Sequence, residues 1–396
     1  MSVRIDEFLT RLLAGFILLT VVLFFLAENG RINAFSTYLI ALTLLPGLLF
    51  SSIRKYLADS NRLIWLATVS LVCFLAASSV WAGDSTSESP KLFGYGILIL
   101  AFIASTVICI QRYSRFNEFL LLAIIASATF SAVLSIYLHV LLPEYQPLPE
   151  PRLFGFGRLE NPVIAAISYG FGFYVGVFLL LNSSDLQARL LLGICLTVLL
   201  VAIVLTGTRT VWAALALATG LGFAIRYPEK ATLLLLGTIA FTAIVGVLAL
   251  GWENIARRAL SFRPEIWNEF ITRTLTTHPL IGFGGGTESQ WTFSEITIKH
   301  PHSIFVSTFY FGGLIGLALL LALYGSCVSV LRLQVKPSNH RLLATMALSY
   351  GFVIGFFDGD NVITKVDHLW WVIWLPISWC LVIKPKIINE NSGGNH

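Results

Sequence analysis

Long apolar runs alternate with short polar segments along almost the whole chain. Runs of about 20 apolar residues are long enough to cross a bilayer as helices, and about twelve such runs can be counted. They lie near residues 12–27, 34–50, 63–81, 92–110, 118–142, 163–181, 190–205, 211–225, 231–251, 303–326, 342–357 and 369–383. The pattern predicts an all-α polytopic membrane protein with a single membrane domain over residues 1–396, because hydrocarbon requires every backbone group to be satisfied internally.

The composition agrees with this fold class. The chain is 56% hydrophobic and 12% charged, with a mean hydropathy of +0.81, whereas soluble domains carry about 25% charged residues. Its five cysteines fall inside or at the ends of the apolar runs. An odd number of cysteines outside the polar loops argues against a disulfide framework.

The basic residues predict the orientation of the helices. One alternate set of connections holds 15 of the 26 Lys and Arg and 7 of the 21 acidic residues, and the opposite set holds 11 and 14. Short loops rich in Lys and Arg face the cytoplasm. Both termini are therefore expected in the cytoplasm, and the net charge of +5 reflects topology and gives no reason to expect nucleic acid. The outward-facing loops would be residues 82–91, 143–162, 206–210, 252–302 and 358–368.

The long polar stretch from Trp252 to His302, between the ninth and tenth apolar runs, is the main candidate for chemistry. It holds two histidines near its end and several cations: Arg257, Arg258, Arg263, Arg273 and Lys299. So many cations beside a membrane predict an anionic, lipid-borne substrate. Within the stretch, Arg263 to Thr276 is expected to be a helix, because Pro264 suits a first helical position and Ile266 and Phe270 share a face. The glycines of GFGGG then allow a tight reversal.

Two arginines are candidates for binding phosphate. Arg209 lies in the short turn TGTRT on the side where bases are scarce. An arginine at a membrane boundary often only extends its head to the interface, but its planar fork also suits bidentate binding of phosphate. Arg263 opens the expected loop helix, whose N-terminus favours anions, although Glu265 partly opposes this. The alternative for Arg263 is a surface charge of little energetic value.

His302 is the candidate general base. It lies where the loop re-enters the membrane, and imidazole titrates near neutral pH. The alternative is an ordinary interfacial histidine, and His300 competes for the role. If the segment is helical by residue 302, only one of the two imidazoles is expected to face the site. Asp358 and Asp360, in FFDGDN, are candidates to orient an imidazole or bind a cation, against the alternative of a solvated loop.

Other chemistry has little support in the sequence. The chain contains no HExxH, no paired cysteines and no dense carboxylate cluster, so neither a metal site nor a cofactor is expected. GFGGG resembles a phosphate-binding loop only in composition, because it lacks a Lys-Ser/Thr pair and a preceding strand.

Four segments in order resemble the O-antigen ligase and O-antigen polymerase superfamily, across residues 150 to 326. They are GRLENPVIAA, TGTRTVWAA, RPEIWNEFITRTLTTHPLIGFGGG and HPHSIFVSTFYFGGLIGL. Members usually carry Asn after the second histidine, where this chain has Ser303. The resemblance implies a membrane-embedded glycosyltransferase with a GT-C-like fold, most like the O-antigen ligases.

The resemblance also implies substrates, site residues and location. The donor would be a glycan on undecaprenyl diphosphate, and the acceptor a sugar hydroxyl of lipid A-core oligosaccharide, with no metal required. His302 matches the family's essential histidine, and Arg209 and Arg263 match arginines that hold the diphosphate. Arg158, Arg257 and Arg258 are weaker matches. The enzyme would lie in the inner membrane of a Gram-negative bacterium, surrounded by membrane lipids, with its active site facing the periplasm.

Two other functions stay open at this point. One keeps the chemistry and changes the acceptor, as in an O-antigen polymerase or a protein O-oligosaccharyl ligase. The other is a transporter of lipid-linked glycans, which would be expected to show inverted repeats and charged residues near the bilayer centre. In this chain the charged candidates lie at the outer boundary and no such repeat is evident.

Overall fold

The structure is a computed structural model. It describes residues 2–82, 89–142, 152–230, 232–233, 236–237, 240, 263–293, 296–298, 300–333 and 338–384. Within these residues eight helices are long and apolar enough to cross a membrane, or nine if the bent pair α2–α3 is one span. The chain is therefore an all-helical polytopic membrane protein, as predicted. A short antiparallel hairpin of β1 (Trp291–Phe293) and β2 (Ile296–Ile298) is the exception.

The helices follow the predicted apolar runs. The first part of the chain forms α1 (Ser2–Leu26), α2 (Gly30–Gly47), α3 (Ser51–Ala58), α4 (Arg62–Ser78), η1 (Ser79–Trp81), α5 (Ser89–Arg112) and α6 (Phe116–Leu141). The middle forms η4 (Gly157–Leu159), α7 (Pro162–Asn182), α8 (Leu186–Thr206), α9 (Arg209–Arg226) and η5 (Pro228–Lys230). The last part forms α12 (Arg263–Thr277), α13 (Ile304–Leu333), α14 (Asn339–Phe357), η6 (Trp370–Trp374) and α15 (Leu375–Leu381).

Four of the twelve predicted spans do not correspond to one of the eight spanning helices. The run at 34–50 is α2, which meets α3 at a 109° bend just beyond the run. The run at 211–225 is α9, a helix with an arginine at each end, and the run at 369–383 is a short apolar helix. Most of the run at 231–251 lies outside the described residues. The other eight runs correspond to the eight spanning helices.

Capping residues set several helix boundaries at the end that carries the site. Asn161 accepts a hydrogen bond from Val163 N at 2.8 Å, and Pro162 occupies the first turn of α7. This is the expected start of a helix, because a side-chain oxygen satisfies a free N–H and proline has none to lose. Gly207 ends α8 in a left-handed conformation with φ of 65°, which costs glycine little.

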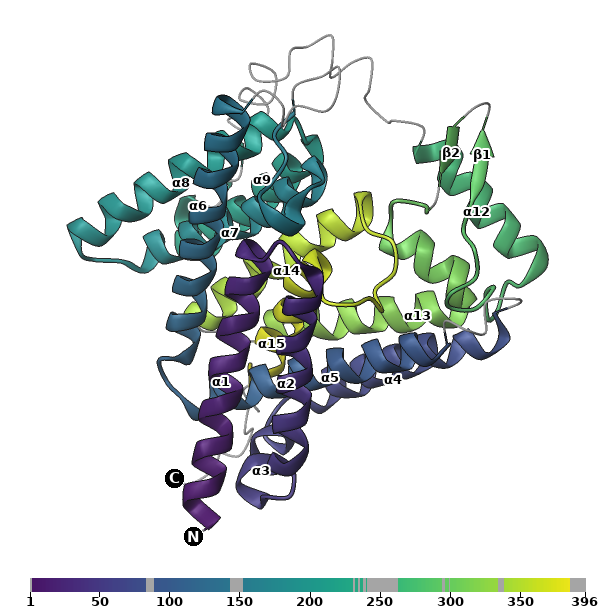
Figure 1. Cartoon of the computed structure of the whole chain (residues 1–396), viewed down its shortest axis with the longest axis horizontal. Helices are drawn as coiled ribbons and strands as arrows, with labels where there is room; N and C mark the ends of the chain where they lie inside the picture. Colours follow the sequence, from purple (N-terminus) through teal and green to yellow (C-terminus); the bar gives the residue numbers. More distant parts are fainter. Residues whose placement is uncertain are drawn as a thin grey trace, which may run out of the picture.

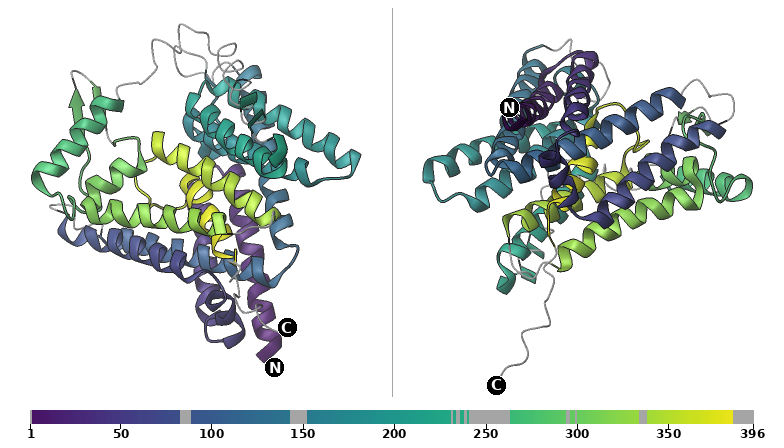
Figure 2. Two further views of the ribbon diagram at one scale, coloured as in Figure 1. Left: turned by 180° about the vertical axis from the view of Figure 1, so that it is seen from behind. Right: turned by 90° about the horizontal axis from the view of Figure 1, so that it is seen from below.

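The helices pack around a centre formed by α14 and the segment from η6 to α15. Figure 1 shows α14 in the middle of the molecule, with α7 and α9 on one side and α13 on the other. Helices α4, α5 and α13 lie side by side in Figure 1 and in both views of Figure 2. Helix α12 and the β-hairpin lie beyond α13, far from α1 in these views.

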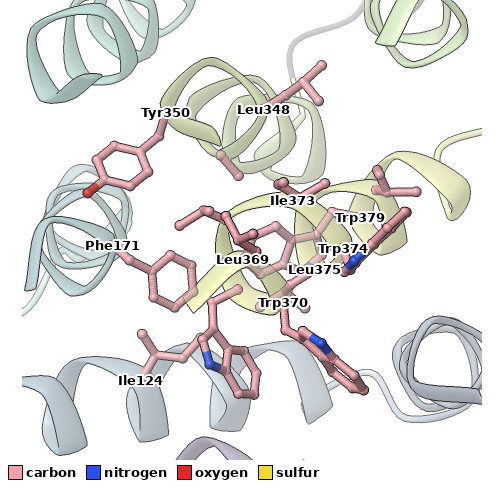
Figure 3. Packing of buried hydrophobic residues seen from close by; sticks show 14 of the residues in the cluster. Ile124, Phe171, Leu348, Tyr350, Leu369, Trp370, Ile373, Trp374, Leu375 and Trp379 are labelled. Carbon is pink, nitrogen blue, oxygen red and sulfur yellow. The ribbon is translucent and has the colours of Figure 1, made fainter. Parts of the chain in front are cut away.

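Buried tryptophans fill the centre. Trp370, Trp371, Trp374 and Trp379 are all at most 1% exposed, and Figure 3 shows several of them among Ile124, Phe171 and Tyr350. Two indoles fix the preceding loop, because Trp370 Nε1 donates to Thr364 O and Trp374 Nε1 donates to Val362 O, both at 3.2 Å. Residues 358–368, named the site loop here, are thus anchored to the core.

Helix α13 is broken at Gly313, where φ is 60° and ψ is −159°. The segment from Pro279 to Gly284 repairs the break. Phe283 N and Gly284 N donate to Tyr310 O and Phe311 O, both at 2.9 Å. On the other side, Leu314 N and Ile315 N donate to Pro279 O and Leu280 O at 2.9 and 3.1 Å. Irregular backbone is tolerated at membrane depth when protein satisfies it, so residues 279–284 support a broken helix.

Candidate active site

The candidate site begins with the unusual backbone of His302. Among the described residues His302 is the one non-glycine residue with a positive φ, 53°. Such a conformation costs on the order of 1–3 kcal/mol and persists only where the surroundings impose it. The chain turns here between Pro301 and the start of α13 at Ile304. Strain of this kind concentrates at functional sites.

The turn brings the two histidines together. The ring centroids of His300 and His302 are 4.1 Å apart, with 55° between the ring planes. The segment is not yet helical at residue 302, so the condition under which only one imidazole was expected to face the site is not met. The pKa of His300 falls to about 4, because the imidazole is buried and lies beside His302. His300 is therefore neutral near pH 7.

Asp358 faces His302 from the end of α14. His302 Nδ1 and Asp358 Oδ1 are 4.0 Å apart, and the histidine side chain is 41% exposed against 15% for the aspartate. Gly359 N donates to Asp358 Oδ1 at 2.9 Å. Burial raises the pKa of Asp358, but His302, Gly359 and His368 together bring it below its usual value. The aspartate is thus ionised, and its Oδ1 lies on the Nδ1 side of the His302 imidazole.

Helix α12 brings Arg263 to the same point. The helix spans Arg263–Thr277 and buries Ile266, Phe270 and Thr274, so its start and its apolar face were predicted correctly and its end lies one residue beyond the predicted one. Arg263 Nε donates to Phe357 O at 3.0 Å, one residue before Asp358. Trp267 Nε1 donates to Pro301 O at 2.9 Å, one residue before His302. Helix α12 is therefore attached to both segments that form the imidazole–carboxylate pair.

Arg209 lies at the same end of the helices. Gly222 of α9 lies against Met346 of α14, while Val211 and Tyr350 both lie close to Gly170. The two helices therefore run antiparallel, which puts the start of α9 at the level of the end of α14. Thr208, which precedes Arg209, accepts a hydrogen bond from Arg152 Nη2 at 3.1 Å.

Arg152 braces this turn. Its Nε also donates to Thr206 O at 2.7 Å. The guanidinium thereby ties the end of α8 to the start of α9, the two elements that fix the backbone position of Arg209. This role was not predicted, because nothing near Arg152 in the sequence points to a partner more than fifty residues away.

Arg158, which was predicted to bind the diphosphate, makes hydrogen bonds to other parts of the protein. Its Nη2 donates to Val366 O at 2.8 Å. With the Asn33 amide oxygen turned toward it, its Nη1 donates to that oxygen at 2.8 Å. Burial lowers the pKa of Arg158, although Asp367 nearby raises it. Arg158 therefore ties the site loop to α2, and its predicted contact with a diphosphate stays a prediction.

The site loop supplies three more ionisable groups. Two of them have a buried atom without a hydrogen-bond partner among the described residues. These atoms are Oδ1 of Asp360 and Nδ1 of His368. Burial and the nearby Asp367 raise the pKa of Asp360 to about 6, while His302 lowers it. Asp367 itself accepts hydrogen bonds from Thr364 Oγ1 at 2.9 Å and Leu369 N at 2.8 Å.

His368 and Asp367 were missed at the sequence level. Their signal was available, because they lie in the predicted outward loop 358–368 directly before an aromatic run. Other predicted residues stay untested, since Arg257, Arg258 and Lys299 lie outside the described residues. Within the described part of the chain, no group of three or more His, Cys, Asp or Glu side chains is arranged to hold a metal ion.

The described residues define a polytopic membrane protein with an imidazole, a carboxylate and a guanidinium gathered at one end of its helices. The O-antigen ligase family matches residues 194–321, which include the TGTR turn, α12 and the histidine pair. An O-antigen ligase of Pseudomonas aeruginosa is 26% identical over 316 residues, covering 80% of this chain and 76% of the relative. Together these matches support assignment of the chain to the O-antigen ligase superfamily, as the four ordered motifs predicted.

Proposed function

We propose that this protein is a glycosyltransferase of the O-antigen ligase type, acting in lipopolysaccharide synthesis. Its donor is a glycan carried on undecaprenyl diphosphate, and its acceptor is a sugar hydroxyl of lipid A-core oligosaccharide. The transfer takes place on the periplasmic side of the inner membrane. The observation that carries the proposal is the pairing of His302 with Asp358 beside Arg263, in a chain with an O-antigen ligase as relative.

In this proposal His302 is the general base. Its Nδ1 faces Asp358, which favours the tautomer with the proton on Nδ1 and leaves Nε2 free. Nε2 takes the proton of the acceptor hydroxyl as the hydroxyl oxygen bonds to the anomeric carbon. The bond from that carbon to the diphosphate breaks, and undecaprenyl diphosphate leaves. A direct displacement of this kind inverts the anomeric configuration. A positioned base contributes on the order of a hundredfold or more to such a reaction.

Arg263 and Arg209 stabilise the leaving group. Negative charge grows on the diphosphate as the glycosidic bond breaks, and fixed cations at that place lower the barrier by a few kcal/mol each. Arg263 is held by one bond from Nε to Phe357 O, so its two terminal nitrogens keep the geometry that binds two phosphate oxygens. Helix α12 adds the positive end of its dipole next to Arg263.

The proposal is tested with single substitutions in a strain that lacks its own copy of the gene. His302→Ala is expected to lower transfer by at least about a hundredfold, and Arg209→Ala and Arg263→Ala to lower it by about a hundred- to a thousandfold. Polymer-capped lipopolysaccharide should disappear from gels while lipid-linked polymer accumulates. The matched controls are His340→Ala and Arg115→Ala, at exposed positions on the opposite helix ends, and these should retain activity.

Two results would contradict the proposal. Full transfer by folded His302→Ala protein would show that His302 is not the general base. A deletion strain that keeps single capped repeats, and loses only long polymer, would show an O-antigen polymerase. A deletion strain that loses glycan from a protein acceptor would show a protein O-oligosaccharyl ligase.

A further inference from the structure

Three buried polar atoms around the His302–Asp358 pair lack a hydrogen-bond partner among the described residues. They are His300 Nδ1, Asp360 Oδ1 and His368 Nδ1. All three belong to the two segments that carry the pair, residues 300–303 and the site loop. Eight further atoms of this kind lie elsewhere in the described residues, but these three are on the segments that carry the pair. A buried polar atom without a partner is unfavourable, so a ligand at the pair that supplied the missing partners would be stabilised.

The three residues lie close to the reacting pair. His300 interacts electrostatically with His302 and Asp358, and Asp360 does so with His302. His368 acts in the same way on Asp358. Each residue of the set is therefore within electrostatic reach of the general base or of its carboxylate.

The site loop is otherwise well satisfied, so the three atoms do not reflect a poorly packed segment. Asp367 has a donor on each oxygen, and Asn361 Oδ1 accepts from Ile363 N at 2.9 Å. Arg158 holds Val366 O, and two tryptophans hold Val362 O and Thr364 O. The loop is thus held in place by its own hydrogen bonds, and the three unpaired atoms keep fixed positions beside the His302–Asp358 pair.

The chemistry of the three atoms fits neutral hydroxyl groups. Asp360 in its charged form accepts hydrogen bonds from hydroxyls and repels phosphate, so a diphosphate belongs on the Arg263 side. A neutral imidazole nitrogen either donates to a hydroxyl or accepts from one. A carboxylate and two imidazoles around the His302–Asp358 pair therefore suit a sugar ring, whose hydroxyls both donate and accept.

We propose that His300, Asp360 and His368 form the acceptor subsite, which binds hydroxyls of the acceptor sugar and presents one of them to His302. This inference rests on the proposed glycosyl transfer. The three residues touch the acceptor sugar, whereas Arg158 acts through the site loop and is a positioning residue.

The test measures KM for each substrate separately with purified full-length protein, a lipid-linked glycan donor and a lipid A-core acceptor. Asp360→Ala and His368→Phe are each expected to raise the acceptor KM about tenfold, the effect of losing one hydrogen bond of about 1.4 kcal/mol. The donor KM should stay within about twofold, as expected for an interaction made by one substrate only. Glu118→Gln, an exposed carboxyl at the start of α6, should change neither value.

The outcomes separate this inference from the proposed function. Equal rises in donor and acceptor KM, or a fall in kcat with an unchanged acceptor KM, would overturn the acceptor subsite while leaving glycosyl transfer intact. Full activity of His302→Ala would instead overturn the proposed function. If Asp360→Ala protein does not accumulate in the membrane, Asp360→Asn, which keeps the side-chain size, is used and should raise the acceptor KM by a smaller factor. An unchanged acceptor KM in both Asp360→Asn and His368→Phe would then count against the subsite.

Discussion

His302 carries its imidazole on a backbone conformation that side chains rarely adopt. The left-handed turn at φ of 53° folds the ring back over His300 and toward Asp358. The centroids of the two rings are thereby 4.1 Å apart. The strain and the proposed chemistry therefore come from the same residue.

This strain predicts a difference between two substitutions at His302. His302→Gly is expected to be more stable than His302→Ala by about 1 kcal/mol, because glycine adopts positive φ without the Cβ penalty. Both variants should lose transfer to the same extent, since both lack the imidazole. Thermal unfolding in detergent, with the transfer assay beside it, measures the two effects. An alanine variant that equals or exceeds the glycine variant in stability would contradict the strained turn.

His300 and Asp360 predict opposite dependences of stability on pH. The pKa of His300 is lowered to about 4, so the folded protein loses stability as pH falls from 6.5 toward 4. The pKa of Asp360 is raised to about 6, so its contribution is present below 3.8 and is lost as pH rises through about 6. The pKa of Asp358 is lowered, so it titrates below this window. The two opposing effects partly cancel in the unmodified protein.

Single variants should reveal each effect. In Asp360→Asn protein, the unfolding midpoint is expected to rise as pH increases from 4 to 6.5. In His300→Gln protein, it is expected to fall between pH 3.8 and 6. The difference between the two slopes is the measured quantity, since other groups contribute equally to both variants. Identical slopes would show that these residues do not titrate as their burial implies.

At the scale of elements, the broken helix α13 depends on glycine. A Cβ added at Gly313 would collide with the backbone of Leu280 and Ile281, and one added at Gly282 would collide with the backbone of Phe311 and Gly312. The two glycines let two backbones approach closely enough for the repairing hydrogen bonds. The N-terminal half of α13, which follows His302, is thereby held at a fixed angle to the half that crosses the membrane.

Alanine substitutions on one helix test this arrangement. Gly313→Ala is expected to destabilise the protein by about 2 kcal/mol or more, because it adds a backbone collision to a positive φ. Gly325→Ala, in the regular half of α13 with open space around its Cβ, should be neutral or stabilising by up to about 1 kcal/mol. The measurement is the unfolding midpoint of each purified variant. Equal midpoints would mean that the break is not required.

At the scale of the whole molecule, the basic loops predict which side of the membrane carries the site. Glu160 is exposed beside η4 at the end of the bundle that carries the site, and Ser114 is exposed between α5 and α6 at the other end. In a variant with all five native cysteines replaced, Glu160→Cys is expected to react with a membrane-impermeant thiol reagent added outside spheroplasts. Ser114→Cys should react only after the membrane is opened, because its loop is rich in arginine. The reverse pattern would place the site in the cytoplasm and contradict the proposed donor side.

Several features of the molecule were predictable from the sequence because their causes are local. Helical periodicity predicted α12 and its buried face, and long apolar runs predicted the eight spanning helices. Residue chemistry and loop position made His302 a candidate base and Asp358 and Asp360 candidate supports. Only the structure selects Asp358, whose Oδ1 lies 4.0 Å from His302 Nδ1. The superfamily followed from the order of four motifs.

Tertiary contacts decided the rest. The break in α13, the ties from Arg152 and Arg158, and the placing of His368 beside Asp358 all join residues far apart in the chain. Local sequence cannot report such pairs, because the free energy that favours them comes from burial and hydrogen bonds that exist only once the helices have packed. The sequence by itself thus determined the membrane class and the residues able to do chemistry, while packing determined which of those residues meet.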